Sequence, residues 1–143
     1  MYVANELTLT VTAFDHDRES GTLTGIGTWE SLKDDERKVE CTASEISILD
    51  NGKFLYLGIR GNDTIAVFAI DEATGALSLV EREPIRGSWP RHFAIDPSGR
   101  WLIAAGANSD TATVFGINQD TGRLVFTGNT ISVPNSICVV FQE

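Results

Sequence analysis

Residues 64–77 read TIAVFAIDEATGAL, and residues 111–124 read TATVFGINQDTGRL. The two segments share a Val-Phe pair, a Thr-Gly pair and a final Leu, and each shared residue recurs 47 positions later. The segment Asn51–Leu57, NGKFLYL, recurs at the same spacing as Ser98–Ala104, SGRWLIA. Because a repeat of roughly 40 to 50 residues is typical of one blade of a β-propeller, this period predicts the fold.

Each copy contains four short strand patterns. An alternating segment such as Phe93–Asp96 is followed by a Gly-containing turn and by an almost wholly apolar segment such as Phe54–Leu57. A second alternating segment, Thr64–Ile70, leads through a Thr-Gly turn to the fourth pattern, Ala76–Val80. Glycine suits such turns because it takes positive φ without steric cost. The apolar second pattern predicts a strand that is buried on both faces between neighbouring blades.

An earlier, partial copy begins at Thr10–Asp15, in which Phe14 precedes Phe68 by 54 residues. The seven extra residues fall at the charged run Lys33–Lys38, which we interpret as a solvated loop insertion. The sequence therefore predicts a single partial β-propeller with these parts: a blade remnant at 1–31, a loop insertion at 32–42, blades at 43–83 and 90–130, and a closing strand at 135–142.

The predicted chain begins and ends inside a blade and not at a blade boundary. The chain opens on a second-type strand at Tyr2–Asn5, continues with strands at Leu9–Phe14 and Thr22–Trp29, and ends on a first-type strand at Ser136–Phe141. Three blades are too few to close a ring, since propellers have about four to eight blades. We therefore expect two exposed apolar blade faces and unpaired strand edges. Either the chain is an excerpt of a longer protein, or two copies associate, with each final strand completing the partner's first blade.

Composition excludes several classes of protein. The formal net charge is −9, which disfavours binding to nucleic acid and to anionic membranes. No apolar run is long enough to span a bilayer, and no signal peptide is visible, so the sequence predicts a cytoplasmic protein. Cys41 and Cys138 are predicted to be reduced thiols. The three tryptophans are predicted to pack between blades: Trp29, Trp89 and Trp101.

Motifs for cofactor chemistry or a Ser-His-Asp triad do not occur. The chain has no Gly-rich phosphate loop, no Cys-x-x-Cys pair and no Gly-x-Ser-x-Gly elbow. Asp15, His16 and Asp17 are contiguous in a polar turn, an arrangement that rarely converges on one metal ion. We predict neither a cofactor nor a metal.

Several segments together resemble one propeller family. These segments are Tyr2–Leu7 (YVANEL), Ala43–Ile48 (ASEISI), Arg60–Phe68 (RGNDTIAVF), Pro90–Ala105 (PRHFAIDPSGRWLIAA) and Val133–Val139 (VPNSICV). They are similar to the lactonase-type seven-bladed β-propellers, which include bacterial 6-phosphogluconolactonases and fungal carboxymuconate cyclases. The resemblance covers essentially the whole chain and the last three-sevenths or so of the family's fold.

The resemblance implies a site at the central cavity. Glu6 matches the family's Asn-Glu-Leu glutamate, which implies a general acid or base, and Arg91 matches its Pro-Arg arginine, which implies a clamp for an anionic group. His92, Glu45 and Arg60 are candidate substrate-binding residues. Structural roles stay open for all three, because His92 alternates with Arg91 along a strand, Glu45 could cap a turn, and Arg60 could join two loops. The family's catalytic histidine and a further arginine lie in earlier blades, which this chain lacks.

Two functions follow from different classes of protein. The first is a cofactor-independent lactonase acting on an anionic sugar-acid lactone, or the related muconate lactonising enzyme. The alternative is a non-catalytic propeller fragment or binding module that self-assembles. In both cases the expected partners are a small anionic lactone or sugar acid and either further copies or the missing blades, because a propeller fold alone does not fix a function.

Overall fold

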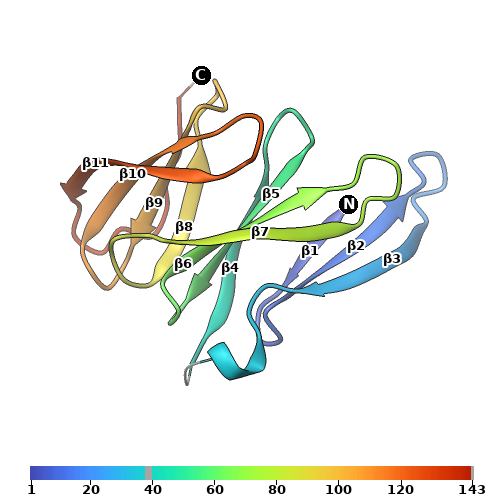
Figure 1. The fold of residues 1–143 in the computed structure, drawn as a ribbon, viewed down its shortest axis with the longest axis horizontal. Helices are drawn as coiled ribbons and strands as arrows, with labels where there is room; N and C mark the ends of the chain where they lie inside the picture. Colours follow the sequence, from blue (N-terminus) through green and yellow to red (C-terminus); the bar gives the residue numbers. More distant parts are fainter. Residues whose placement is uncertain (38–39, 143) are drawn as a thin grey trace.

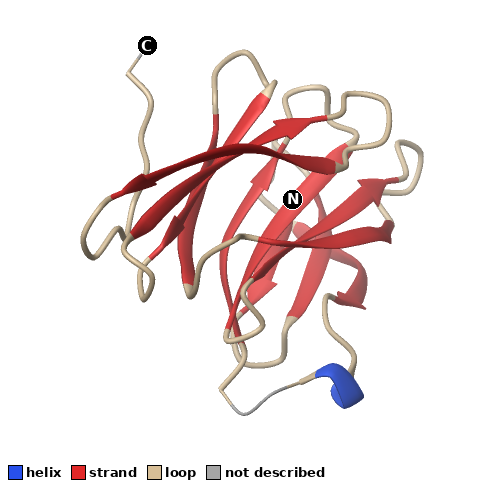
Figure 2. Ribbon diagram, turned by 60° about the vertical axis from the view of Figure 1, so that its left-hand side comes forward, coloured by secondary structure: helices blue, strands red, loops and turns tan. Residues whose placement is uncertain are grey.

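The computed structural model describes residues 1–37 and 40–142 and contains eleven strands in this part of the chain. The strands are β1 (Tyr2–Asn5), β2 (Thr10–His16), β3 (Leu23–Glu30), β4 (Thr42–Ile48), β5 (Phe54–Arg60), β6 (Thr64–Ile70), β7 (Leu77–Pro84), β8 (Pro90–Ile95), β9 (Trp101–Gly106), β10 (Thr111–Ile117) and β11 (Leu124–Ser132). A short 3₁₀ helix, η1 (Asp34–Glu36), is the one helical turn of the described residues (Figure 2). No helix among them has the length and apolar character that crossing a bilayer requires.

The strands form three antiparallel sheets that follow the chain. Their orders are β1-β2-β3, β4-β5-β6-β7 and β8-β9-β10-β11, so every sheet is a simple meander. Figure 1 shows the sheets side by side in chain order, and their first strands approach one another, since β4 contacts both β1 and β8. This confirms the prediction of an all-β propeller segment. The loop insertion predicted at 32–42 contains η1, and its residues 38 and 39 lie outside the described part of the chain.

Two apolar clusters hold the three sheets together. The first seam, between the sheets β1–β3 and β4–β7, is lined by Leu9, Val11, Leu55, Leu57, Ile59 and Phe68, among others. The second seam, between β4–β7 and β8–β11, is lined by Phe54, Tyr56, Val67, Phe93, Leu102 and Phe115, among others. Odd and even positions of β5 therefore enter different seams, as strand alternation requires. The prediction that the second strand of a blade is buried on both faces is confirmed for β5.

Hydrogen bonds repeat across the seams as the sequence does. The Tyr2 hydroxyl donates to the Gly75 carbonyl at 2.9 Å, and the Tyr56 hydroxyl donates to the Gly122 carbonyl at 2.9 Å. In each case a tyrosine of β1 or of β5, the strands that match the second strand pattern of a repeat, reaches the Thr-Gly turn of the next sheet. Burial raises the pKa of both phenols. The corresponding position of the third sheet is Ile103, which has no hydroxyl to donate.

The predicted closing strand is wrong. Residues 133–142 carry no strand, although Val139 lies beside β8, where its N–H donates to His92 Nδ1 at 3.3 Å. The physical reason is that a β-strand needs a hydrogen-bonded neighbour. The blade that this segment was predicted to complete, β1-β2-β3, lies at the opposite end of the row of sheets (Figure 1).

The two outer faces differ in polarity. On the first sheet, Asn5 Nδ2 donates to the hydroxyls of Thr10 (2.9 Å) and Thr12 (2.8 Å), which gives this face a polar centre. On the last sheet, Trp101 is 42% exposed and Val125 is 62% exposed. The prediction that Trp101 packs between blades is therefore wrong, because its counterpart Phe54 enters a seam and no described sheet lies beyond β8–β11.

The other two tryptophans lie between sheets. Trp29 packs against the cluster of the first seam, as predicted. Trp89 precedes β8, is half-buried, and lies under the guanidinium of Arg60 from the neighbouring sheet. Cys41 and Cys138 are free thiols, the first buried and the second exposed, as predicted.

Candidate functional site

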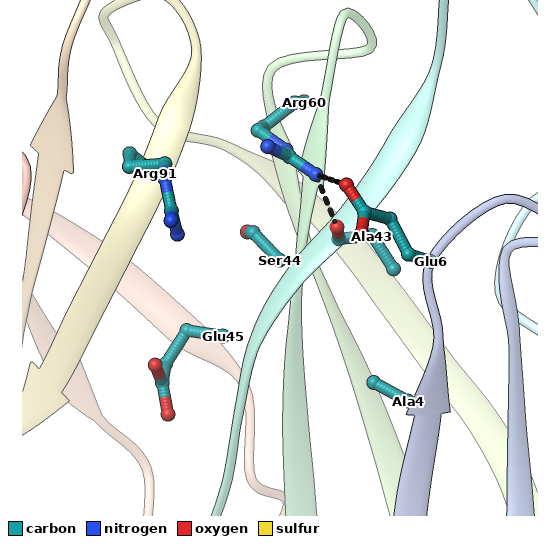
Figure 3. A pocket seen from close by; sticks show the side chains of 7 residues that line it. All are labelled: Ala4, Glu6, Ala43, Ser44, Glu45, Arg60 and Arg91. Carbon is teal, nitrogen blue, oxygen red and sulfur yellow. Dashed lines mark hydrogen bonds and ion pairs between the residues drawn. The ribbon is translucent and has the colours of Figure 1, made fainter.

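One pocket draws residues from all three sheets where their first strands converge. Its volume is about 230 Å³. The lining residues, shown in Figure 3, are Ala4, Glu6, Ala43, Ser44, Glu45, Arg60 and Arg91. Four of the five predicted site residues therefore meet in one place, and His92 is outside the lining set.

Arg60 lines the pocket and contacts residues from or beside all three sheets. Its Nη2 forms an ion pair with Glu6 Oε1 and donates to the Ala43 carbonyl at 2.8 Å, and its guanidinium lies 5.8 Å from the centre of the Trp89 ring. The Arg60 side chain is only 13% exposed, whereas that of Glu6 is 61% exposed. Arg60 therefore balances the charge of Glu6 and fixes its carboxylate in place, while Glu6 stays accessible from the pocket.

Arg91 is the second cation of the pocket. It lies on β8, it is exposed, and its guanidinium makes no hydrogen bond or ion pair with any residue of 1–37 and 40–142. Figure 3 shows its side chain on the side of the pocket opposite the Glu6–Arg60 pair. An arginine presents a planar fork of donors that matches a carboxylate or a phosphate. Arg91 is therefore available to an anionic ligand, whereas Arg60 is already engaged.

His92 follows Arg91 at a β-bulge of β8, where the register with β9 shifts between Pro90 and His92. Its Nε2 is 3.2 Å from Glu45 Oε2, and its Nδ1 accepts the N–H of Val139 at 3.3 Å. The imidazole therefore lies between the Glu45 carboxylate and the backbone of the C-terminal segment. These two contacts favour the structural alternative for His92. The imidazole also helps to hold the carboxylate of Glu45, which lines the pocket.

Ser44 fixes the start of β8 beside Arg91. Its hydroxyl donates to the Pro90 carbonyl at 2.6 Å across the second seam. Gly58 makes room for this bond, since a Cβ at Gly58 would lie 2.4 Å from Ser44 Oγ and 3.4 Å from the Pro90 oxygen. A glycine inside a strand often marks such a close approach.

We expect Gly58→Ala to destabilise the protein by about 1 to 3 kcal/mol, because the new methyl group displaces the Ser44 hydroxyl and leaves the Pro90 carbonyl without its donor. Urea unfolding measures this change. Gly25→Ala is the matched control, since Gly25 lies in the exposed strand β3 and a methyl group added there would meet no atom within 4 Å. An equal loss in both variants would contradict the role given to Gly58.

The sequence model of the family described as "Lactonase, 7-bladed beta-propeller" matches residues 1–141. The chain belongs to this lactonase family. It is 34% identical to the 6-phosphogluconolactonase of Bacillus subtilis (strain 168) over 140 residues, which are 98% of this chain and 40% of that protein.

Solved structures agree with the lactonase fold. A protein from Lactobacillus plantarum superimposes with a TM-score of 0.94 at 29% identity, covering 99% of this chain and 41% of that one. The periplasmic gluconolactonase of Pseudomonas aeruginosa superimposes with a TM-score of 0.86 at 32% identity, covering 94% of this chain and 37% of that one. This lactonase chain thus spans about two fifths of the length of the relatives it matches.

The sequence pattern did not indicate several residues in or around the pocket. Ser44 and the Ala43 carbonyl line or support it, and Trp89 stacks against Arg60. A signal for Ser44 was present in the isolated Gly58 of an otherwise apolar strand, which indicates close backbone approach. The Trp89 contact had no local signal, because it joins residues 29 positions apart in sequence across a seam.

Proposed function

We propose that the pocket is part of a lactonase site that opens an anionic sugar-acid lactone without a cofactor. The observation that carries the proposal is the guanidinium of Arg91, which pairs with none of the described residues and lies across one pocket from the accessible carboxylate of Glu6. The names of relatives, among them the 6-phosphogluconolactonase of Bacillus subtilis, support a phosphorylated sugar lactone as the substrate.

The chemistry assigns different steps to the two residues. Glu6 accepts a proton from a water molecule as that water attacks the lactone carbonyl carbon, and the carbonyl oxygen becomes an oxyanion. When the bond between this carbon and the ring oxygen breaks, Glu6 returns the proton to the ring oxygen, and a hydroxy acid is released. Arg91 stabilises negative charge on the phosphate or the oxyanion throughout. Arg60 keeps the Glu6 carboxylate oriented.

The experiment is hydrolysis of 6-phosphogluconolactone by the isolated chain, compared with buffer. We expect acceleration over buffer, and we expect Glu6→Gln to lower the rate by about 100-fold or more, since general base catalysis contributes about 10² to 10⁴. Glu19→Gln, at an exposed glutamate of the β2–β3 turn, makes the same charge change away from the pocket and should leave the rate unchanged. A parallel arm with 3-carboxymuconate tests the lactonising reaction of the family's cyclases. No acceleration in either arm favours the alternative, a non-catalytic propeller module.

Association and location stay predictions. The exposed Trp101 and Val125 of the last sheet favour contact with a further sheet, supplied by a second copy or by additional blades. Light scattering over a dilution series tests self-association, and a monomer at every concentration would contradict it. The predicted cytoplasmic location is tested by fractionating cells, because one solved relative is described as periplasmic.

A further inference from the structure

We infer that Asp63 is a positioning residue for Arg91. The link between the two runs through the loop from β7 to β8, which carries the chain from the second sheet to the third. Asp63 holds this loop at both ends. Its carbonyl accepts the N–H of Ile85 at 3.0 Å, and its carboxylate oxygen Oδ1 accepts the N–H of Trp89 at 2.7 Å. Arg91 follows Trp89 by two residues, so the carboxylate of Asp63, together with the Ser44 hydroxyl on the Pro90 carbonyl, places the start of β8.

The loop needs such a restraint because Trp89 has an unfavourable backbone conformation. Its φ is +64°, in the left-handed region that residues other than glycine rarely occupy. A residue before proline is also directed towards extended conformations, and residue 90 is proline. Unfavourable conformations of this kind persist where the surrounding structure fixes them. The short bond to Asp63 Oδ1 is one restraint on Trp89, and the stacked guanidinium of Arg60 is another.

The next repeat contains an equivalent aspartate that makes the same two hydrogen bonds, but the chain it holds does not line the pocket. Asp110, which lies 47 residues after Asp63, accepts the N–H of Val133 at 2.8 Å through its carbonyl and the N–H of Asn135 at 2.7 Å through Oδ1. Asp63 and Asp110 have similar φ values, +59° and +53°. Two residues after Asn135 stands Ile137, which is 63% exposed and does not line the pocket. The two aspartates thus make equivalent bonds with different consequences.

This equivalence separates positioning from stability. Asp63→Gly and Asp110→Gly each remove one carboxylate acceptor at a residue whose positive φ glycine adopts freely. Both should therefore lose similar stability. Asp63→Asn keeps an acceptor oxygen, and asparagine tolerates the left-handed region, so this conservative variant should restore the bond.

The first measurement is independent of catalysis. In ¹H–¹⁵N spectra of the full chain, Asp63→Gly should shift the amide signals of Trp89 and Arg91 and the Nε–H signal of Arg91, whereas Asp110→Gly should shift Asn135 and leave the Arg91 signals unchanged. Arg91 signals that do not move in Asp63→Gly would overturn the inference, whether or not the chain hydrolyses a lactone.

The second measurement uses inorganic phosphate as the probe of the Arg91 guanidinium, so its interpretation rests on the proposed function. We expect Asp63→Gly to raise the phosphate Kd by about fivefold to tenfold, Asp63→Asn to restore it, and Asp110→Gly to leave it within about twofold. Equal weakening in both glycine variants would overturn the inference. If the unsubstituted chain binds no phosphate, the anion site of the proposed function fails, while the amide shifts still decide whether Asp63 positions Arg91.

Discussion

Replacing Arg91 with glutamine is expected to weaken binding of an anionic lactone or of phosphate by about 10- to 100-fold, since hydrogen bonds to charged groups contribute about 1.5 to 3 kcal/mol. Hydrolysis of 6-phosphogluconolactone should fall by about 100-fold, in line with the loss of one donor to a developing oxyanion. The free energy of unfolding should change by less than about 0.5 kcal/mol, because Arg91 is exposed and pairs with none of the described residues. Isothermal titration, a lactonase assay and urea unfolding measure the three quantities.

Arg18→Gln is the matched control for this prediction. Arg18 is an exposed arginine in the turn between β2 and β3, and its loss changes the net charge by the same amount. If Arg18→Gln weakens the anion as much as Arg91→Gln does, the effect comes from the overall charge of −9 and not from the pocket. Arg91→Lys should recover part of the affinity, because lysine keeps the charge but lacks the planar donor fork.

Replacing Phe115 with alanine is expected to cost about 3 to 5 kcal/mol of stability, the usual range for removing a buried aromatic ring. Phe115 is completely buried in the second seam, and its ring centre lies 5.6 Å from that of Phe126. Because small domains have only about 5 to 15 kcal/mol of stability, the loss should be visible as a large drop in the urea midpoint. If the alanine variant does not fold, Phe115→Leu should fold with a smaller loss.

The equivalent phenylalanine of another repeat is the control for Phe115→Ala. Phe14 occupies the corresponding position of the first sheet, but it is only half-buried, and it follows Ala13, which is fully buried. Strand alternation therefore directs Phe14 to the outer face. Phe14→Ala should cost clearly less than Phe115→Ala, and equal losses would show that burial in a seam is not what makes the position matter.

The sequence was sufficient to predict the strands of the sheets, but not which segments and side chains find a neighbouring sheet. The 47-residue spacing of Phe68 and Phe115 placed the strands of two complete blades, because period and alternation are local properties of the chain. The segment Ser136–Phe141 has a strand-like pattern and yet forms no strand, because its partner lies at the far end of the fold. Likewise, the outward position of Trp101 depends on which sheets are present and not on its neighbours in sequence.

For the site as well, the sequence indicated some residues and missed the contacts that hold them. Glu6 and Arg91 were identified by resemblance, Glu45 and Arg60 were candidates from their places in the sequence, and the structure brings all four to one pocket. His92 contacts Glu45 instead of lining the pocket, at a β-bulge that the sequence pattern did not indicate. The contacts that hold these side chains in place, from Ser44 to Pro90 and from Asp63 to Trp89, cross the second seam between residues 46 and 26 positions apart. Gly58 signals the close approach at Ser44, but no local pattern identifies the partners of either contact, because they lie across a seam.

The arrangement of three sheets in a row also determines which parts of the pocket unfold first. The middle sheet β4–β7 has a neighbour on each side, whereas β1–β3 and β8–β11 have one apiece, so transient opening should start at the ends, as in other linear repeat proteins. Fraying of the first sheet would carry away Glu6, and fraying of the last sheet would carry away Arg91. Mild denaturant should therefore disable the pocket before it unfolds the middle sheet, which holds Glu45 and Arg60.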